Sequence, residues 1–281
     1  MKYLVLGSSG LIGNALCQYL KREQHEVFTF DINDNKYEDL RIYQNEILMR
    51  YMDECDFIFF LTFDVGGSVY LDKYQQTYQF ISNNIKIMDQ TFEALFKCKT
   101  PFIFVSSQMS NMNSSTYGNL KRIGEQYTKS LNGLFVKFWN VYGYERDLEK
   151  SHVIIKFILK AHQHKKIMMK TNGNEQRQFI HSDDASKALY TLSNRYTSIS
   201  RSNPLHITSH KWISILDIAK LINNVIFDDM IDIIPSEKID LHQTIKNEPD
   251  PYALSFWKPE INIEKGIKRV YDELVNHNKI K

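Results

Sequence analysis

Tyr117 and Lys121 stand four positions apart in an amphipathic stretch, and this spacing could support proton transfer. In a helix, positions i and i+4 share one face, so the lysine ammonium could favour the tyrosine phenolate. Taken alone, the commoner meaning of this spacing is a pair of surface residues. Ser107 ends an apolar run just ahead of the pair, at the strand edge where open parallel sheets bind ligands. Together the three side chains predict a site that moves a proton on a bound small molecule.

A glycine-rich segment, Gly7-Ser8-Ser9-Gly10-Leu11-Ile12-Gly13, directly follows the first apolar run. The first glycine permits a tight strand-to-helix turn, the second lets the backbone approach a pyrophosphate, and the third lets helix and strand pack closely. The N-terminus of the following helix attracts phosphates. The segment predicts a dinucleotide seat formed by Gly7, Ser9, Gly10, Leu11, Ile12 and Gly13.

Asp31 ends the second apolar run, 18 residues beyond Gly13. At that place a carboxylate accepts hydrogen bonds from the adenosine ribose hydroxyls and repels a 2′-phosphate. The residue therefore favours NAD over NADP. Asn33, Asn35 and Lys36 lie close enough in the sequence to leave NADP open as an alternative.

Short apolar runs alternate with amphipathic stretches through the first half of the chain, a pattern typical of a parallel sheet between helices. Five runs are apolar throughout, as in strands buried on both faces. They predict strands at 3–6, 26–31, 57–62, 102–106 and 134–139. The stretches between them predict helices at 11–22, 43–52, 70–97 and 117–131.

The second half has a looser rhythm, with predicted helices at 153–163, 183–194 and 213–227 and predicted strands at 167–170 and 205–208. The fold class predicted for the whole chain is α/β, a Rossmann-type doubly wound parallel sheet with a smaller mixed α/β C-terminal lobe. We expect a dinucleotide-binding domain over residues 1–143. Residues 144–281 would then form mainly a substrate lobe, with some segments returning to the first core.

The composition narrows the possible partners. Lysine and arginine number 35 and aspartate and glutamate 33 among 281 residues, so the formal charge of +2 argues against nucleic-acid binding driven by phosphate neutralisation. No apolar stretch is long enough to span a membrane. Cys17, Cys55 and Cys98 are odd in number and form no CxxC pair, which predicts no metal site and favours the cytoplasm.

Three further motifs appear in order: Asn83-Asn84-Ile85, the Phe-Trp-Asn-Val-Tyr-Gly segment at 138–143, and the Arg-Gln-Phe-Ile-His-Ser-Asp-Asp segment at 177–184. With GxxGxxG and YxxxK, they make the chain resemble the extended short-chain dehydrogenases/reductases. The resemblance is to the group of nucleotide-sugar epimerases, dehydratases and reductases, and it spans nearly all of the chain.

The resemblance implies a role for each matching position. Tyr117 would be the general acid/base and would also contact the cofactor. Lys121 would bind the nicotinamide ribose and tune Tyr117, and Ser107 would bind the reacting sugar oxygen. Further cofactor contacts would come from Leu61, Thr62, Phe63 and Asn84. Further substrate contacts would come from Gln108, Met109, Asn140 and Arg177. Asn140 as a turn cap and Arg177 as a solvated cation remain alternatives. The group also implies carbohydrate biosynthesis and a homodimer formed through a four-helix bundle.

Several departures from the group narrow the chemistry. Gln108 and Met109 follow Ser107 where 4,6-dehydratases carry an Asp-Glu pair, so we do not expect water elimination. The three cysteines lie away from the sites where C3 and C5 epimerases use one. Leu61-Thr62-Phe63 stands where the group usually has small residues against the cofactor, which predicts a shifted nicotinamide pocket.

The remaining chemistry is NAD-dependent redox at one carbinol, most often C4, of a nucleotide sugar, as a 4-epimerase or 4-dehydrogenase. An NADPH-dependent 4-keto-sugar reductase is the alternative. A non-catalytic NAD-binding sensor or scaffold is the other alternative, and retention of Ser107, Tyr117 and Lys121 together argues against it.

Overall fold

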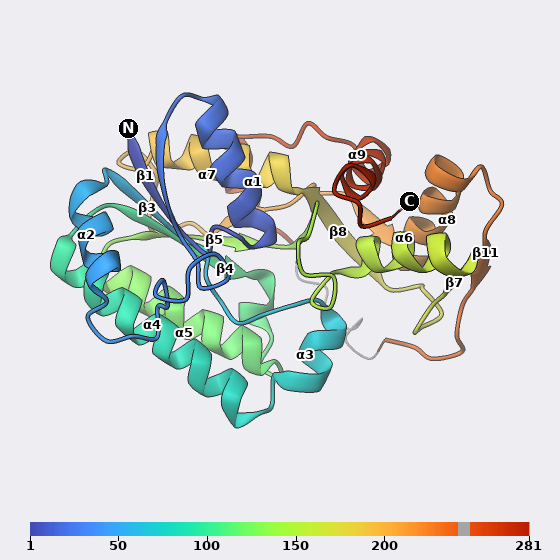
Figure 1. The fold of residues 1–281 in the computed structure, drawn as a ribbon, viewed down its shortest axis with the longest axis horizontal. Helices are drawn as coiled ribbons and strands as arrows, with labels where there is room; N and C mark the ends of the chain where they lie inside the picture. The colour runs from blue at the N-terminus through green and yellow to red at the C-terminus, as the bar shows by residue number, and fades with distance from the viewer. Residues whose placement is uncertain (241–247, 281) are drawn as a thin grey trace.

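A computed structural model of the protein describes residues 1–240 and 248–280, and its larger part is a six-stranded parallel sheet with helices on both faces (Figure 1). The strand order is β2-β1-β3-β4-β5-β9. The strands are β1 (Lys2–Leu6), β2 (Glu26–Phe30), β3 (Phe57–Phe60), β4 (Phe102–Ser107), β5 (Leu134–Phe138) and β9 (Leu205–Ile207).

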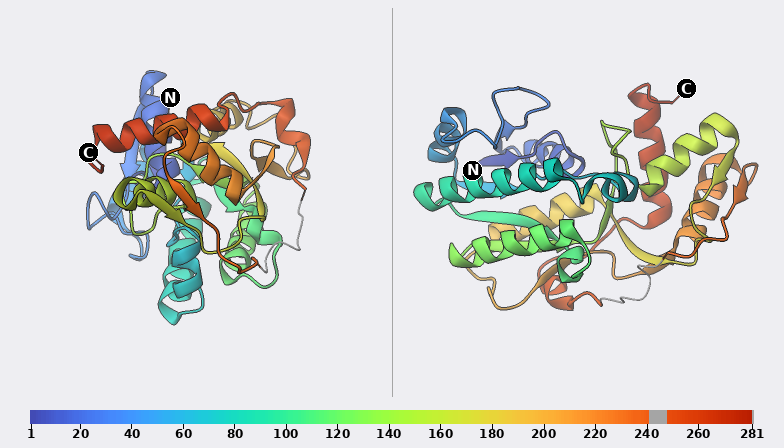
Figure 2. Two further views of the ribbon diagram at one scale, coloured as in Figure 1. Left: turned by 90° about the vertical axis from the view of Figure 1, so that its right-hand side faces the viewer. Right: turned by 90° about the horizontal axis from the view of Figure 1, so that it is seen from below.

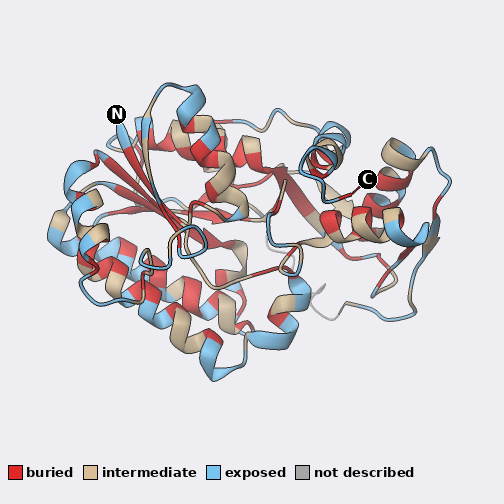
Figure 3. Cartoon of the chain, viewed as in Figure 1, coloured by how far each residue is buried: buried red, intermediate tan, exposed pale blue. Residues whose placement is uncertain are grey.

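Alternate residues of the central strands belong to different cores, which explains why their sequences are apolar throughout. In β1, Tyr3 and Val5 pack under α1 (Leu11–Arg22) and α7 (Ser182–Asn194). Leu4 and Leu6 pack under the helices of the other face, α2 (Glu46–Glu54), α4 (Tyr78–Cys98) and α5 (Thr116–Ser130). The central strands β1, β3, β4 and β5 are accordingly buried along most of their length, whereas the edge strand β2 is mostly exposed or half-buried (Figure 3).

A smaller lobe lies at one end of the sheet, with its own core formed by α6 (Val153–His164), α8 (Ile215–Phe227) and α9 (Ile263–Asn276) (Figure 1). Its central strand β8 (Gln176–His181) pairs with β6 (Asn140–Tyr142) and β10 (Trp212–Ser214). A second small sheet joins β7 (Lys166–Met168) to β11 (Asp232–Ile234). Two 3-10 turns, η1 (Gln108–Asn111) and η3 (Pro251–Ser255), complete the connections described here.

The predicted fold class is confirmed, and all five strands predicted in the first half are present. Three described segments from the second half return to the first sheet: α7 and η3 pack in its core, and β9 is its last strand. The boundary at residue 143 stays a prediction. Among the described helices, none combines the length and the apolar character needed to cross a bilayer.

The single helix predicted at 70–97 is wrong, because the structure has two helices there, α3 (Ser68–Tyr74) and α4. The helix is interrupted at residues 75–77. There the Thr77 hydroxyl accepts a hydrogen bond from the Phe80 backbone amide at 3.3 Å. This is an N-cap, which starts a new helix by satisfying a free amide. Among the described strands and α-helices, five were not predicted: β6, β8, β10, β11 and α9.

Candidate functional site

A large cavity of about 2150 Å³ runs from the carboxyl edge of the parallel sheet to the smaller lobe. Its walls include the glycine-rich turn after β1, the loop after β3, the end of β4, and residues of α6 and β8. Ligands bind at this edge in open parallel sheets, because the helix N-termini and the connecting loops converge there.

The glycine-rich turn has the geometry of a phosphate-binding turn. Gly7 has φ of +88°, a left-handed conformation that favours glycine. A Cβ on Gly13 would lie 2.0 Å from the Gly7 carbonyl oxygen, so only glycine lets α1 pack this closely. A Cβ on Gly10 would meet no protein atom closer than 3.4 Å, and this residue also lines the cavity. The backbone at Gly10 is therefore the part of the turn open to a bound group.

Asp31 lies directly after β2, beside the glycine-rich turn. One carboxylate oxygen accepts a hydrogen bond from the Ser9 amide at 3.0 Å, and the other accepts one from the Asn33 amide at 2.9 Å. The Asp31 amide donates to the Glu38 carboxylate at 2.9 Å. Two carboxylates thus meet at the edge of the cavity where the sequence predicts the adenosine ribose.

Ser107 and Tyr117 meet where β4 ends and α5 begins. Ser115 caps α5 by accepting a hydrogen bond from the Gly118 amide at 3.0 Å, which places Tyr117 in the first turn. Burial raises the pKa of Tyr117 to about 12, and a hydrogen bond with Ser107 acts in the opposite direction. The phenol is therefore a proton donor at neutral pH and becomes an acceptor only beside a stabilising charge.

Lys121 lies one turn further along α5 and is only 2% exposed. Its ammonium donates to the Val105 carbonyl at 2.7 Å and lies 3.9 Å from the centre of the Phe63 ring. Burial lowers the pKa of Lys121 to about 7, while the charge of Glu125 raises it. Phe63 also packs edge-on against Tyr117, with ring centres 5.6 Å apart. The Phe63 ring, in the segment after β3, thus covers the ammonium of Lys121.

Most of the predicted site residues line this one cavity, but Lys121 and Asn84 do not. The Asn84 amide bonds to the backbone of Asp64 in both directions, at 2.7 and 3.1 Å, and to the Phe80 carbonyl. Asn84 therefore supports the loop after β3 from behind. Its neighbour Asn83 lines the cavity instead.

The two predicted substrate residues of the lobe are partly engaged by the protein. The side-chain amide of Asn140 donates a hydrogen bond to the backbone carbonyl of Gln178 at 3.3 Å. The Arg177 guanidinium forms an ion pair with Asp240 and donates to the Gln176 carbonyl at 2.8 Å. Arg177 lines the cavity, so it is neither fully solvated nor free of a protein carboxylate.

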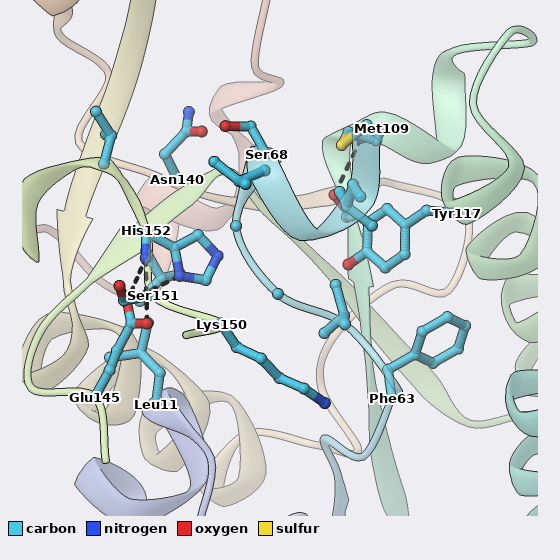
Figure 4. A pocket seen from close by; sticks show the side chains of 18 of the residues that line it. Leu11, Phe63, Ser68, Met109, Tyr117, Asn140, Glu145, Lys150, Ser151 and His152 are labelled. Atoms are coloured by element: carbon cyan, nitrogen blue, oxygen red, sulfur yellow. Dashed lines mark hydrogen bonds and ion pairs between the residues drawn. The ribbon is translucent and has the colours of Figure 1, made fainter. Parts of the chain in front are cut away.

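A histidine–glutamate pair in the cavity wall was not predicted. Nδ1 of His152 lies 2.9 Å from a Glu145 carboxylate oxygen, and the His152 amide donates to the same carboxylate. Figure 4 shows this pair on one side of the cavity, Phe63 and Tyr117 on the other, and Lys150 between them. Lys150 also bonds to Asp64 at 3.3 Å. No sequence signal marked these residues, because a loop brings them to the site.

Comparisons with known proteins give a consistent picture. The sequence model described as "NAD dependent epimerase/dehydratase family" matches residues 3–207. A provisionally named UDP-glucose 4-epimerase of Methanocaldococcus jannaschii is 29% identical over 59% of this chain and 55% of its own length. The GDP-L-fucose synthase of Sinorhizobium fredii is 26% identical over 56% of this chain and 52% of its own length. The matches span about half the length of both relatives.

Solved structures share the whole fold at low identity. An epimerase of Methanothermobacter thermautotrophicus superposes with a TM-score of 0.84 at 17% identity, over 99% of this chain and 93% of its own. The UDP-glucose 4-epimerase of Thermotoga maritima, solved with UDP-glucose, gives 0.80 at 19% identity, over 99% of this chain and 100% of its own. These likenesses establish the architecture.

Proposed function

The chain belongs to the NAD dependent epimerase/dehydratase family, and on this premise we propose that it is an NAD-dependent oxidoreductase of nucleotide sugars. It acts on one carbinol or keto carbon, C4, as a 4-epimerase or 4-dehydrogenase. The observation that carries the proposal is the contact of Ser107 with Tyr117 in the same cavity as the glycine-rich turn. In this proposal residues 1–143 hold the cofactor and residues 144–281 mainly hold the sugar nucleotide.

The described residues fit a dinucleotide. The backbone at Gly10 is open to the cavity, and the Asp31 carboxylate faces the turn where ribose hydroxyls would lie. The buried Thr62 hydroxyl has no hydrogen-bond partner among the described residues. The chemistry that bound NAD supplies is hydride acceptance and return. The groups that would hold it are Gly7, Ser9, Gly10, Leu11, Ile12, Gly13, Asp31, Leu61, Thr62 and Phe63.

The chain's own residues supply the proton transfer. Tyr117 takes the proton of the sugar hydroxyl as the carbinol carbon is oxidised, and Ser107 holds the same oxygen. Lys121 lies behind Tyr117, where its positive charge favours the phenolate. Because Phe63 covers Lys121, a contact between this ammonium and a ribose hydroxyl requires the Phe63 ring to move.

The sugar nucleotide would lie between β4 and the lobe. Gln108 and Met109 would contact the sugar, and Asn140 and Arg177 would contact its phosphates. Two lysines on one face of α6, Lys156 and Lys160, also line this part of the cavity. They add positive charge for a diphosphate, beyond the Arg177 that Asp240 partly neutralises.

The proposal is tested by unfolding the purified protein and identifying the released nucleotide by chromatography and mass, then assaying UDP- and GDP-sugars for turnover. Stoichiometric NAD or NADH with interconversion of two C4 epimers is the expected result. A protein that carries no nucleotide and turns over none of these sugars with added NAD would contradict it.

Cofactor choice gives a prediction at Asp31. We expect Asp31→Ala to weaken NAD binding by about tenfold, as one charged hydrogen-bond acceptor is lost, and to narrow the preference over NADP. Full reversal is not expected, because the Glu38 carboxylate remains beside the site. Kd values for both cofactors from calorimetry provide the measurement. A wild-type protein that binds NADPH more tightly than NADH would overturn this assignment.

A second candidate is a nucleotide-4-keto-sugar reductase that also epimerises a carbon beside the ketone, and it is favoured by one observation, the His152–Glu145 pair in the cavity wall. A histidine oriented by a carboxylate can exchange a proton with a carbon next to a ketone. The similarity to a GDP-L-fucose synthase is compatible with such an activity. NADPH would then be the alternative cofactor.

His152→Gln separates the two candidates. For redox at C4 alone, we expect kcat to change less than about threefold, because the glutamine amide can still bond to Glu145. For a keto-sugar enzyme that also exchanges carbon-bound protons, solvent deuterium incorporation into the product should fall by about 10²-fold or more. Mass spectrometry of the product made in D2O measures this. Glu145→Gln, which leaves the imidazole in place, is the companion variant.

The remaining predictions concern assembly, location and the binding-only alternative. Exposed apolar side chains lie along α4 and α5, two helices that run side by side (Figure 2): Ile85, Phe96, Ile123 and Tyr127. They support the predicted homodimer through a four-helix bundle, which a mass measurement at micromolar concentration tests.

The cytoplasm stays a prediction from the cysteine content. A sensor or scaffold would retain NAD and show no turnover that depends on Tyr117.

A further inference from the structure

Three consecutive residues of β4 each contact one residue from the same face of α5, at spacings of four along the helix. Ser107 bonds to Tyr117, the Val105 carbonyl accepts from Lys121, and Ser106 bonds to Glu125. The first two helix residues belong to the proposed reaction. The third, Glu125, lies behind them and has not been assigned a role.

The Glu125 carboxylate is 5% exposed, and both of its oxygens are bonded. One oxygen accepts a hydrogen bond from the Ser106 hydroxyl at 2.5 Å. The other lies 3.3 Å from the ammonium of Lys137, a buried residue of β5. Lys137 in turn donates to the Asn111 side chain at 2.8 Å. One carboxylate therefore connects α5 to β4, β5 and the turn η1 that follows Ser107.

The charges of this cluster are unbalanced. Among the described residues of this cluster, two buried ammonium groups, Lys121 and Lys137, lie near one buried carboxylate, that of Glu125. Its charge acts to raise the pKa of Lys121, and it forms an ion pair with Lys137. The titratable groups facing Lys121 and Glu125 are Tyr117 on α5, Lys137 on β5 and, beyond Lys137, His206 on β9. The rings of Phe63 and Phe104 that complete the surroundings of Lys121 are uncharged.

We propose that Glu125 is a positioning residue of the reaction, which holds Tyr117 and Lys121 in register with Ser107 and serves as the buried counter-charge of Lys121. The proposal rests on the proposed function, since it assigns Glu125 a task in the same oxidoreductase site. Glu125 touches neither sugar nor cofactor and acts through Ser106, Lys137 and Lys121.

The sign of the expected pH effect follows from the charge. Lys121 can favour the Tyr117 phenolate only while the lysine is protonated, so its support is lost as pH rises through the pKa of Lys121, about 7. Removing the Glu125 charge lowers that pKa further. The alkaline limb of the kcat profile should therefore move to lower pH.

The test uses the full chain with Glu125→Gln, which keeps the hydrogen-bonding shape but removes the charge. We expect the alkaline limb to move down by about one pH unit, and kcat above pH 8 to fall by about tenfold with KM for the sugar nucleotide little changed. Glu125→Asp keeps the charge and should keep the wild-type limb, even if Tm falls.

Thr128→Ala is the matched control, because Thr128 is buried on the same helix and its hydroxyl, among the described residues, bonds only to the Gly124 carbonyl. It should lower Tm without moving the profile. If Glu125→Gln and Thr128→Ala lose the same amount of Tm and show the same pH profile of kcat, Glu125 is merely structural and the proposal is wrong. If Glu125→Gln does not fold, Ser106→Ala replaces it. That variant should lower kcat about tenfold at unchanged KM, and an unchanged kcat would overturn the proposal.

A second readout does not need the sugar. NADH affinity, followed by fluorescence between pH 6 and 9, should weaken as Lys121 loses its proton and should do so about one pH unit lower in Glu125→Gln. Absence of sugar turnover in the wild type would contradict the proposed function while this shift still supports the role of Glu125. An NADH profile identical in both proteins would contradict the role of Glu125 alone.

Discussion

Tyr117→Phe is expected to lower kcat by about 10²- to 10⁴-fold, the usual contribution of a positioned general acid or base. The ring remains in place against Phe63, so the fold and the cavity should be unchanged. Only the phenolic hydroxyl is lost, together with its hydrogen bond to Ser107. NADH binding, measured by fluorescence, should stay within about threefold of the wild type, because the variant removes no predicted phosphate or ribose contact of the glycine-rich turn.

Tyr127→Phe is the matched control for this variant. Tyr127 lies on the same helix, partly exposed, with its ring stacked on Phe92 at 4.9 Å. Loss of its hydroxyl should leave kcat unchanged. Equal turnover by Tyr117→Phe and the wild type on the true substrate would mean that the proton relay assigned here is wrong.

Substituting alanine at Gly10 and at Gly13 should give two different losses. At Gly10 the new methyl group meets protein atoms only at ordinary contact distance but projects into the predicted phosphate site. We expect Tm of the cofactor-free protein to stay within a few degrees and NAD affinity to fall by at least about tenfold.

At Gly13 the methyl group would lie 2.0 Å from the Gly7 carbonyl oxygen, so α1 has to move away from the turn. Overpacking of this kind costs about 1–3 kcal/mol, and both Tm and NAD affinity should fall. Differential scanning calorimetry and NAD titration of both variants provide the measurement. A Gly10→Ala protein that binds NAD as tightly as the wild type would contradict the proposed position of the pyrophosphate.

Short-range spacing was sufficient to predict the parts of the site that one turn or one helix builds. The glycine-rich turn is such a part, because Gly7, Gly10 and Gly13 contact each other locally. Tyr117 and Lys121 are another, because helical geometry alone places positions i and i+4 on one face. The alternation of apolar strands and helices likewise predicted the sheet, since strands buried on both faces are apolar throughout.

Only the tertiary structure decided what surrounds these residues. It places the ring of Phe63 over Lys121, turns the Asn84 amide towards the Asp64 backbone, and pairs Arg177 with Asp240. The two residues of each contact lie on different parts of the fold, and they are 20 positions apart for Asn84 and Asp64 and 63 positions apart for Arg177 and Asp240. No periodicity records them, because they depend on how separate elements pack.

The same reason explains what the sequence did not reveal. Glu145 and His152 enter the cavity from a loop with no regular pattern, and the Glu125–Lys137 pair joins a helix to a strand that follows it. Each of these side chains is an ordinary polar residue by type and spacing. Their proposed roles depend on the neighbours that the fold brings to them: Glu145 lies beside His152, and Lys137 lies beside the buried Glu125. The sequence by itself thus determined the fold class and the reactive residue types, whereas the packing of the two lobes decided their environment.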